Sequence, residues 1–567
     1  MSYSDSAIAS GSDVDVLVVG AGPVGLSLAI ELGQRGVRCL AIERNDRVGY
    51  SPRAKTTNAR TREHLRRWGI ADALRNASPI ARDYPFDVVF ATRMTGPTLA
   101  RFENVSEGGA ERSELYSEGG QWVPQYTLEE VLRARASSLP GVELRFQAEL
   151  DRFEQDADGV AAQIKDLRTG EVRAVRCAYL VGADGARSTV RQAIGAQMQG
   201  DERAVFGNYS IIFKAPDLAK RHLHGRAVMY WVVNPDVSAL LGPMDMHGLW
   251  FFMATKLPGN IGPETVDAVD LIRRGTGLSD LQIEVVRADP WIARSLIADR
   301  YRKGRVFLAG DACHLHPPFG GFGMNMGIGD AVDLGWKIAA VLQGWGGGAL
   351  LDSYEQERRP VHQRTIDEAA ANYATLGNEL VRPGIEDDGP EGDRVRREVG
   401  DEILASKIRE FKTLGLVLGA NYAGSPLLVP DGTPPPPEHP RHYVPSASPG
   451  CLAPHAWLLD GSSLYDHFGL GFTLLVMDGD AGAAERFASA AARLGIPLKI
   501  LAPGDERLAR LYRARLALIR PDQHVAWRGD ALPADPDGML LHVTGRAGQE
   551  RSSGQTPAVK QMEQTRA

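Results

Sequence analysis

The sequence lacks the features that mark several classes of protein. Its 567 residues include only four cysteines, which form no CxxC pair and show no zinc-ligand spacing. We therefore expect reduced thiols, no metal site and a cytoplasmic chain. No apolar run reaches the ~18 residues that a transmembrane helix requires, so no membrane span is expected. The formal net charge of −7 gives no sign of nucleic-acid binding.

Internal repeats are also absent, so the length must be explained by distinct domains. A chain of 567 residues is too long for one hydrophobic core, and roughly two to three domains are expected. Residues 205–255 are rich in aromatic and β-branched residues, which indicates a separate sheet domain. Long helices are expected over 327–344 and 353–377, and a loop over 380–400. The proline-rich stretch 430–440 is typical of a stiff linker, and strand and helix patterns alternate beyond it.

The first motif lies near the N-terminus. Residues 14–19 form a short apolar run that is typical of a buried parallel strand. The glycine-rich GAGPVG at 20–25 follows, then a segment with helical periodicity, then a second apolar strand that ends at Glu43. Glycines at the turn from strand to helix, with an acid after the next strand, form the fingerprint of a dinucleotide-binding βαβ unit.

The segment 305–325, RVFLAGDACHLHPPFGGFGMN, is more informative than that fingerprint. An apolar strand runs into Gly310-Asp311, and a proline- and glycine-rich loop leads to Asn325 and a helix. A carboxylate at a strand end can hydrogen-bond a polyol, and a glycine-rich helix start offers free N–H groups to an anion. A flavin needs both, because its ribityl hydroxyls must be held and its reduced ring is negative. The segment therefore predicts a flavoprotein and not a nicotinamide dehydrogenase.

A third motif lies between these two. Residues 181–188 read VGADGARS, with Arg191 after them. Alone, Asp184-Gly185 is equally typical of a hairpin turn. The order and separation of all three motifs are much harder to obtain by chance.

On these motifs the chain resembles the single-component FAD-dependent aromatic hydroxylases, the group A flavoprotein monooxygenases. The resemblance runs from about residue 13 to about 375, and resumes at PGCLAPHAWL (449–458) in a tail similar to that of the phenol and polyketide hydroxylase branch. It implies an α/β fold like that of p-hydroxybenzoate hydroxylase. A Rossmann-like FAD-binding domain carries an inserted β-sheet substrate domain, and a thioredoxin-like α/β domain follows. Without a CxxC, thiol redox chemistry is not expected in that tail.

The resemblance also sets the expected domain boundaries. The FAD-binding domain is discontinuous, and the substrate domain is made from two of the intervening segments. The expected segments are a disordered leader at 1–12, the FAD-binding domain at 13–85, 120–200 and 290–385, the substrate domain at 86–119 and 201–289, a helix and Pro-rich linker at 386–440, the thioredoxin-like domain at 441–548 and a disordered tail at 549–567.

Residue roles are implied by the resemblance motif by motif. Glu43 would take the adenosine ribose, Asp311 the ribityl chain, and the helix start at 323–325 would face N1 and C2=O of the flavin. Backbone N–H groups there would stabilise the electron-rich reduced ring. The full set of expected FAD contacts is Gly20, Gly22, Pro23, Val24, Gly25, Glu43, Arg44, Arg53, Gln125, Leu150, Asp184, Gly185, Asp311, Pro317, Gly323, Met324 and Asn325.

The implied reaction begins with reduction of FAD by NADH or NADPH. Oxygen adds to give a flavin C4a-hydroperoxide, which hydroxylates a phenolic or polycyclic aromatic substrate. The catalytic base stays unknown: His314 and His247 are candidates, although a packed or surface role is more typical of each histidine. Pro317, which the resemblance places over the substrate side of the flavin ring, is a further candidate for the catalytic site. Tyr230, Trp231, Trp250 and Phe252 are candidates for substrate contact, with ordinary sheet core as the alternative. The resemblance also implies a homodimer.

Two other functions stay open on the sequence. The same fold could perform Baeyer–Villiger oxidation or epoxidation of a polyketide or terpenoid. A non-enzymatic binding protein with a flavoprotein fold is a remote alternative, because such a protein should have lost the flavin contacts that are present here. One departure from the family is Cys313, where an alanine often precedes the histidine. A small apolar cysteine should preserve the loop, while altering its redox sensitivity.

Overall fold

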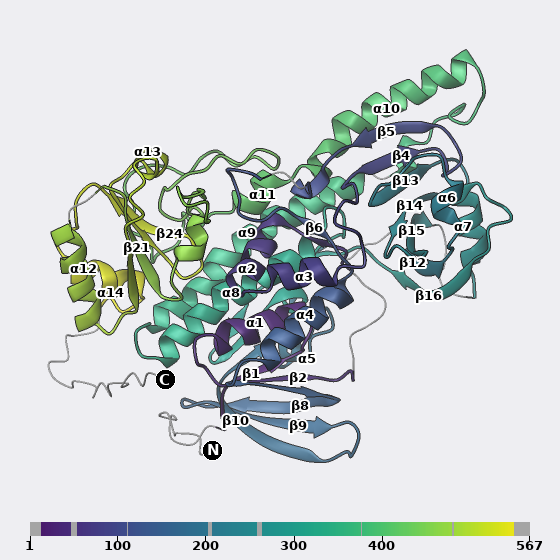
Figure 1. The fold of residues 1–567 in the computed structure, drawn as a ribbon. Helices are drawn as coiled ribbons and strands as arrows, with labels where there is room; N and C mark the ends of the chain where they lie inside the picture. Colours follow the sequence, from purple (N-terminus) through teal and green to yellow (C-terminus); the bar gives the residue numbers. More distant parts are fainter. Residues whose placement is uncertain are drawn as a thin grey trace, which may run out of the picture.

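The computed structural model describes residues 13–46, 54–109, 112–201, 207–257, 264–375, 377–478 and 481–548. The expected leader at 1–12, the expected tail at 549–567 and Arg53 lie outside the described residues. Figure 1 shows a central body with one sheet domain at each end, the aromatic-rich sheet on the right and the C-terminal sheet on the left.

The central sheet follows the order β18-β19-β10-β1-β2-β7, with β9 pairing β10 and β8 pairing β9. The strands β19, β10, β1, β2 and β7 are parallel to one another. Their bounds are β1 (Val14–Val19), β2 (Cys39–Glu43), β7 (Val142–Phe146), β8 (Ala148–Gln155), β9 (Val160–Asp166), β10 (Val172–Gly182), β18 (Arg302–Lys303) and β19 (Val306–Leu308).

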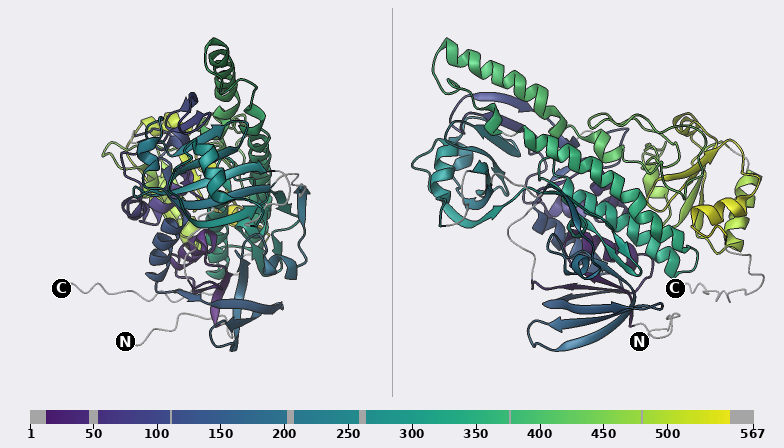
Figure 2. Two further views of the ribbon diagram at one scale, coloured as in Figure 1. Left: turned by 90° about the vertical axis from the view of Figure 1, so that its right-hand side faces the viewer. Right: turned by 180° about the vertical axis from the view of Figure 1, so that it is seen from behind.

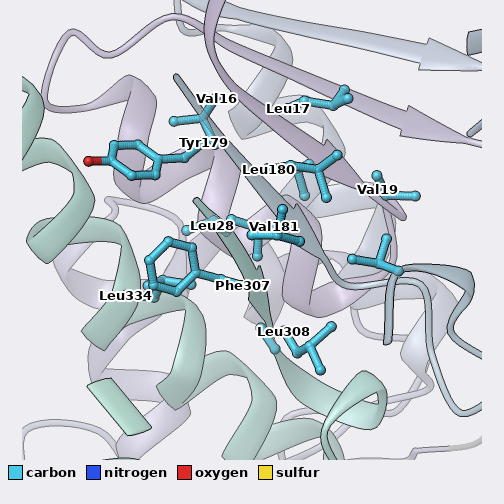
Figure 3. Close-up of a cluster of buried hydrophobic side chains, with 14 of the residues drawn as sticks. Val16, Leu17, Val19, Leu28, Tyr179, Leu180, Val181, Phe307, Leu308 and Leu334 are labelled. Carbon is cyan, nitrogen blue, oxygen red and sulfur yellow. The ribbon is translucent and has the colours of Figure 1, made fainter. Parts of the chain in front are cut away.

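The core of the central body lies on both faces of this sheet (Figure 3). Its strands are near-continuous apolar runs because parallel strands are covered on both sides. Leu17 of β1, Leu180 of β10 and Leu308 of β19 are fully buried, as are Leu28 and Leu334 from the covering helices. In register, Val19 pairs with Gly182, and Gly182 pairs with Leu308. The carboxyl ends of these three strands therefore meet at one edge.

Helices and short strands surround this sheet. The long helices α8 and α9 pack side by side and run through the body (Figure 2). The bounds are α1 (Pro23–Gly33), β3 (Thr56–Thr57), α2 (Ala59–Arg67), α3 (Ala71–Ala77), β6 (Gln121–Trp122), α4 (Gln125–Ser137), α5 (Thr189–Ala193), β11 (Met198–Asp201), β17 (Ser295–Ala298), β20 (His314–Leu315), α8 (Phe322–Leu342) and α9 (Gly348–Ala374).

The aromatic-rich segment forms a seven-stranded sheet in the order β16-β12-β15-β14-β13-β4-β5. The helix α10 covers one face, and α7 packs on the other. The bounds are β4 (Val88–Ala91), β5 (Thr98–Phe102), β12 (Gly207–Lys214), α6 (Leu218–Arg221), β13 (Met229–Val233), β14 (Ser238–Pro243), β15 (Leu249–Leu257), α7 (Ala268–Thr276), β16 (Glu284–Trp291) and α10 (Pro390–Phe411).

The expected loop over 380–400 is wrong in its second half, because α10 begins at Pro390. Proline is well suited to the first helical position, and the acids that follow it favour a helix N-terminus. Val395, Val399 and Ile403 recur at helical spacing and pack against the aromatic-rich sheet. The charges that suggested a loop lie mostly on the solvent face of this helix, whereas its glycines, Gly392 and Gly400, are buried.

The C-terminal domain is a four-stranded mixed sheet in the order β22-β21-β23-β24. The parallel pair β21–β22 joins an antiparallel pair, and helices flank them, which matches the expected thioredoxin-like arrangement. Within the described ranges no helix is long and apolar enough to cross a membrane. The bounds are α11 (Leu414–Leu418), β21 (Phe472–Val476), α12 (Ala481–Arg493), β22 (Leu498–Leu501), α13 (Arg507–Tyr512), β23 (Leu516–Ile519), β24 (Val525–Gly529) and α14 (Pro536–Val543).

Candidate active site

The loop between β1 and α1 requires its glycines. Gly20 has φ +103°, and a Cβ there would lie 2.4 Å from the carbonyl oxygen of Ala183. A Cβ on Gly25 would lie 1.8 Å from the Gly20 oxygen. A Cβ on Gly22, in contrast, would project into open space, with no heavy atom of the described residues, its chain neighbours aside, within 4 Å. Because α1 has no side-chain cap, the loop leaves backbone N–H groups for an anion such as a phosphate.

The structure brings the other two motifs against this loop. Gly20 packs on the segment of Asp184, because a Cβ on Gly20 would lie 3.1 Å from the Cα of Asp184. Val24 leaves no room for a side chain at Gly310, where a Cβ would lie 2.8 Å from Val24 Cγ2. Arg191 donates through Nη1 to the Ala312 carbonyl at 3.1 Å. Three motifs that are far apart in the sequence therefore form one edge, at the carboxyl ends of β1, β10 and β19.

Carboxylates from each motif lie at this edge. Glu43 accepts a hydrogen bond from the Ala21 N–H at 3.1 Å. Asp184 accepts from the N–H groups of Thr189 at 2.7 Å and Val190 at 3.2 Å through Oδ2. Its buried Oδ1 has no hydrogen-bond partner among the described residues. Asp311 is half-buried in the turn Gly310–Ala312. Such carboxylates are acceptors for the hydroxyl groups of a ribose or ribityl chain.

The start of α8 is a second anion-binding feature. Gly320 and Gly321 have φ +100° and +67°, conformations that favour glycine. Gly321 is the N-cap of this long helix, which no side chain caps. Asn325 accepts from the Asn58 N–H at 3.0 Å and donates to the Thr56 carbonyl at 3.0 Å. The amide of Asn325 thus ties the helix start to a neighbouring strand and leaves the first-turn N–H groups uncapped.

These features fit a flavin dinucleotide. The loop open at Gly22 suits its phosphates, and the unpaired Oδ1 of Asp184 suits a hydroxyl or N–H donor. The uncapped start of α8 suits the negative charge of a reduced ring. Bound FAD would supply electrons from NAD(P)H and the activation of O2.

Other expected FAD contacts have their polar groups occupied or lie at the periphery. Gln125 accepts from the Ala54 N–H at 3.1 Å and donates to Glu129 at 2.7 Å, so it positions the segment 54–57. Leu150 is buried in β8, and Arg44 is exposed just after β2. Pro317 is buried in the loop before α8. Direct FAD contact by these residues stays a prediction.

The two candidate histidines have other roles in the structure. His247 is exposed on the turn between β14 and β15, where its N–H donates to Asp245 at 2.8 Å. His314 is fully buried, and its Nε2 lies 2.8 Å from Asp330 Oδ2. Asp330 Oδ2 also accepts from the Gly310 N–H at 3.0 Å. His314 therefore braces the Gly310 turn through Asp330.

Asp330 is the centre of a buried group that we call the cofactor-side cluster: His314, Asp330, Arg358 and His362. Arg358 Nε donates to Asp330 Oδ1 at 2.9 Å, and His362 Nε2 lies 2.8 Å from the same atom. Burial alone raises the pKa of Asp330, but His362, His314 and Arg358 together hold it well below its usual value. Ligand-type atoms of Cys313, His314 and Asp330 lie within 4.8 Å of one another. Because Arg358 and Gly310 already engage Asp330, this is a hydrogen-bonded charge network and not a metal site.

Only one of the four expected substrate contacts faces the loop before α8. Trp231 lies 6.0 Å from Phe319 of that loop, measured between ring centroids. Tyr230, Trp250 and Phe252 belong to the apolar cluster on the opposite face, under α7. Successive side chains of a strand point to opposite faces, so the expectation for these three residues needs correction: they are core of the far face.

Sequence reasoning missed Lys55, which lies just before β3. Its ammonium lies over the ring of Phe251, 4.4 Å from the ring centroid. The segment SPRAKTTNAR (51–60) contains no acidic residue that could pair with Lys55. That local lack of a partner was the one sequence feature that could have singled out this lysine.

Comparison with known proteins decides the family. Residues 13–369 match the family model of an FAD binding domain, and residues 446–547 match the model of the C-terminal domain of aromatic-ring hydroxylases. The chain belongs to the FAD-dependent aromatic-ring hydroxylases.

Individual relatives support the same family over nearly the whole chain. Tetracenomycin B2 monooxygenase-dioxygenase of Streptomyces olivaceus is 36% identical over 564 residues, 94% of this chain and 98% of the relative. The 4-methyl-5-nitrocatechol 5-monooxygenase of a Burkholderia species is 34% identical over 562 residues, 93% and 96% of the two chains. The rebeccamycin biosynthetic enzyme RebC with reduced flavin matches with TM-score 0.87 and 37% identity, over 94% of this chain and 99% of RebC.

The family confirms the expected fold class, the FAD cofactor and the monooxygenase activity on an aromatic substrate. It sets aside the alternative of a non-enzymatic binding protein. The hydroxylase also has four free, buried cysteines. Burial raises the pKa of Cys313 well above its usual value, so this departure from the family introduces no reactive thiolate.

Proposed function

We propose that this hydroxylase adds one oxygen atom from O2 to a phenolic ring, either a single ring or part of a polycyclic aromatic substrate, with NADH or NADPH as the reductant. The observation that carries the proposal is a group of three aromatic side chains, Phe90, Trp231 and Phe319, that lies next to the start of α8; we call this group the aromatic wall. Trp231 stacks on Phe90 at 5.3 Å and contacts Phe319 in the loop that leads into that helix. The wall is therefore next to the place where the flavin ring would lie.

The residues of the site would act in three ways. The uncapped start of α8 would hold negative charge on the reduced cofactor through its N–H groups, an effect of about 3 kcal/mol for one such donor. Phe319 and Trp231, each buried, would keep water from the reacting atoms. The cofactor-side cluster would hold the Gly310 turn, and with it Asp311, against the ribityl chain.

The relatives support a phenolic or polycyclic substrate. The names of two relatives specify a nitrocatechol and tetracenomycin B2. For this chain the class extends to phenols, catechols and hydroxylated polycyclic quinones.

The test is NADH and NADPH oxidation by the FAD-loaded hydroxylase over a panel of simple phenols, nitrocatechols and polycyclic quinones, with hydrogen peroxide quantified. A true substrate should accelerate oxidation manyfold and release little peroxide, and its product should gain one oxygen atom by mass spectrometry. If no phenol in the panel is hydroxylated, the proposal fails, and Baeyer–Villiger or epoxidase chemistry becomes the next hypothesis.

We further propose that the hydroxylase is a cytoplasmic homodimer. Four buried free thiols favour a reducing compartment, and the dimer rests on the family resemblance. Light scattering of the FAD-loaded protein would test the dimer, and a mass of one chain would contradict it.

A further inference from the structure

Lys55 occupies a fixed position between the start of α8 and the aromatic-rich sheet. The Val123 N–H donates to its carbonyl at 2.8 Å, and β3, which starts one residue later, pairs with β6. Asn325 at the start of α8 donates to the next carbonyl, that of Thr56. The backbone at Lys55 is therefore held by both the flavin-binding body and the first turn of α8.

The side chain of Lys55 extends to the aromatic-rich sheet. Its Nζ lies over Phe251, a buried residue of β15. Phe251 belongs to the same apolar cluster as Trp231 and Phe319, and its ring lies 5.9 Å from that of Trp122. The ammonium thus lies on the sheet face where the proposed function places the substrate.

Among the described residues, Lys55 Nζ has no hydrogen-bond or carboxylate partner. This is unusual, because the two fully buried lysines of the described ranges are each paired. Lys337 lies 2.8 Å from Asp333, and Lys407 lies 3.0 Å from Glu410. Desolvation lowers the pKa of Lys55 to about 8, so that neutral amine is present near neutral pH. Lys55 is half-buried, and an unpaired cation that is partly removed from water is costly; the ring of Phe251 offsets part of that cost.

We propose that Lys55 binds the ring hydroxyl of the aromatic substrate in its ionised form. This rests on the proposed function. The neutral amine of Lys55 takes the proton from the phenol: the O–H bond breaks, an N–H bond forms, and a phenolate–ammonium pair results. No electron is transferred in the step. A phenolate ring is more nucleophilic than the phenol, so Lys55 is the catalytic residue that the histidine candidates did not supply.

The test measures ionisation of a bound phenol in the oxidised FAD-loaded hydroxylase, without NADH or NADPH. The probe is 4-methyl-5-nitrocatechol, whose anion absorbs visible light, at a pH where the free probe is mainly neutral. We expect the bound probe to show the anion spectrum. Lys55→Met keeps the aliphatic stem over Phe251 and removes the charge, so it should abolish that spectrum and weaken binding at least about tenfold, the effect of one pKa unit. Lys55→Arg keeps a cation and should retain the anion spectrum.

Lys256 offers a matched control on β15, the strand that carries Phe251. Its Nζ lies 5.7 Å from the Tyr373 ring centroid but is paired with Glu379 at 2.8 Å. Lys256→Met should therefore leave the probe spectrum unchanged. If Lys55→Met does not retain FAD, Lys55→Gln replaces it in the comparison.

Three results would overturn the proposal. The wild-type protein could bind the probe as neutral catechol or not at all. The uncharged variants Lys55→Met and Lys55→Gln could show the same anion fraction as the wild type. Both neutral variants could lose FAD affinity while probe ionisation is retained, which would assign Lys55 to the cofactor. In each case, substrate-dependent hydroxylation by the wild type would still support the proposed function, so the two failures are distinguishable.

Discussion

Two buried charge clusters lie one turn apart on α8, and they differ in what they connect. The cofactor-side cluster, centred on Asp330, takes its four members from the flavin-binding body, and beyond that body Arg358 Nη1 donates to the Tyr422 hydroxyl at 3.2 Å. The second, which we call the domain-joining cluster, consists of Asp333, Lys337, Glu357, Arg520 and Asp522. Arg520 belongs to the C-terminal domain, and its Nη1 donates to Glu357 of α9 at 2.7 Å.

The clusters also differ in their balance of charge. The cofactor-side cluster has one carboxylate and one guanidinium, Asp330 and Arg358, with two imidazoles beside them. In the domain-joining cluster, Lys337 and Arg520 are shared among three carboxylates. The first therefore depends on a single ion pair, whereas the second can lose one contact and keep others. We infer that the cofactor-side cluster fixes the geometry of the Gly310 turn and that the domain-joining cluster fixes the position of the C-terminal domain.

The largest expected effect comes from Asp330→Asn. The change leaves the buried Arg358 without its counter-charge and turns one of the two acceptor oxygens into an NH2 donor, which must face either the Gly310 N–H or Arg358 Nε, at a cost of about 3–5 kcal/mol. Urea unfolding of the FAD-free and FAD-loaded protein should show the loss, and FAD should dissociate more readily. Asp352→Asn, at an exposed acid paired with Arg302, should change neither. Unaltered FAD affinity in Asp330→Asn would contradict the role of this cluster.

A smaller effect is expected from Arg520→Met. Lys337 still balances part of the charge of Asp333 and Glu357, so we expect a loss of about 2–3 kcal/mol, confined to the docking of the C-terminal domain. Limited proteolysis should cleave earlier in the Pro-rich segment 430–440, while FAD affinity stays at the wild-type level. The control is Arg493→Met, at an exposed pair with Asp537. Loss of FAD from Arg520→Met would show that the two clusters act as one.

The pH dependence of stability gives a third test. Burial lowers the pKa of His362 to about 3, whereas an unfolded histidine titrates near ~6.5. Between these values the unfolded chain binds the extra proton, so the free energy of unfolding falls as pH drops from about 6.5 toward 3, by up to about 1.4 kcal/mol per pH unit.

The variant His362→Gln should flatten that slope. Glutamine can donate to Asp330 and accept from the Tyr301 hydroxyl, which lies 2.8 Å from His362 Nδ1, but it does not titrate. His247→Gln changes an exposed histidine and should keep the wild-type slope. Denaturant midpoints at a series of pH values would measure both, and equal slopes for all three proteins would remove His362 as the source.

The smallest expected effect concerns the cysteines. Cys313, beside the cofactor-side cluster, is fully buried and donates through Sγ to the Gly310 carbonyl at 3.4 Å. Cys451, near the C-terminal domain, is 7% exposed, and burial raises its pKa to about 11. A thiol reagent added to the native protein should react slowly, with Cys451 before Cys313. Cys451→Ala should remove the faster phase, and modification of Cys313 first would contradict the ranking.

Much of the cofactor site could be predicted from sequence because its constraints are local. Gly20 and Gly310 have positive φ in turns that directly follow strands, and Gly25 lies against the Gly20 carbonyl in the same loop. Glu43 and Asp311 follow strands whose ends must meet in a parallel sheet. The resemblance to a family extended this to residues such as Asn325. In the structure, Asn325 ties β3 to α8, a contact that no spacing along the chain could show.

The rest depended on which faces meet in three dimensions. The sequence by itself determined the three glycine-containing motifs, the flavoprotein class and the order of the domains, because turns and buried parallel strands have local signatures. Tertiary structure alone decided that Trp231 faces the loop before α8 while Tyr230 lies on the opposite face of the sheet. It also decided that α10 covers the sheet, that His314 bonds to Asp330, and that Lys55 lies over Phe251 with no ion-pair partner among the described residues. Those outcomes depend on side-chain alternation, domain packing and the burial of charge, which arise only when distant segments come together.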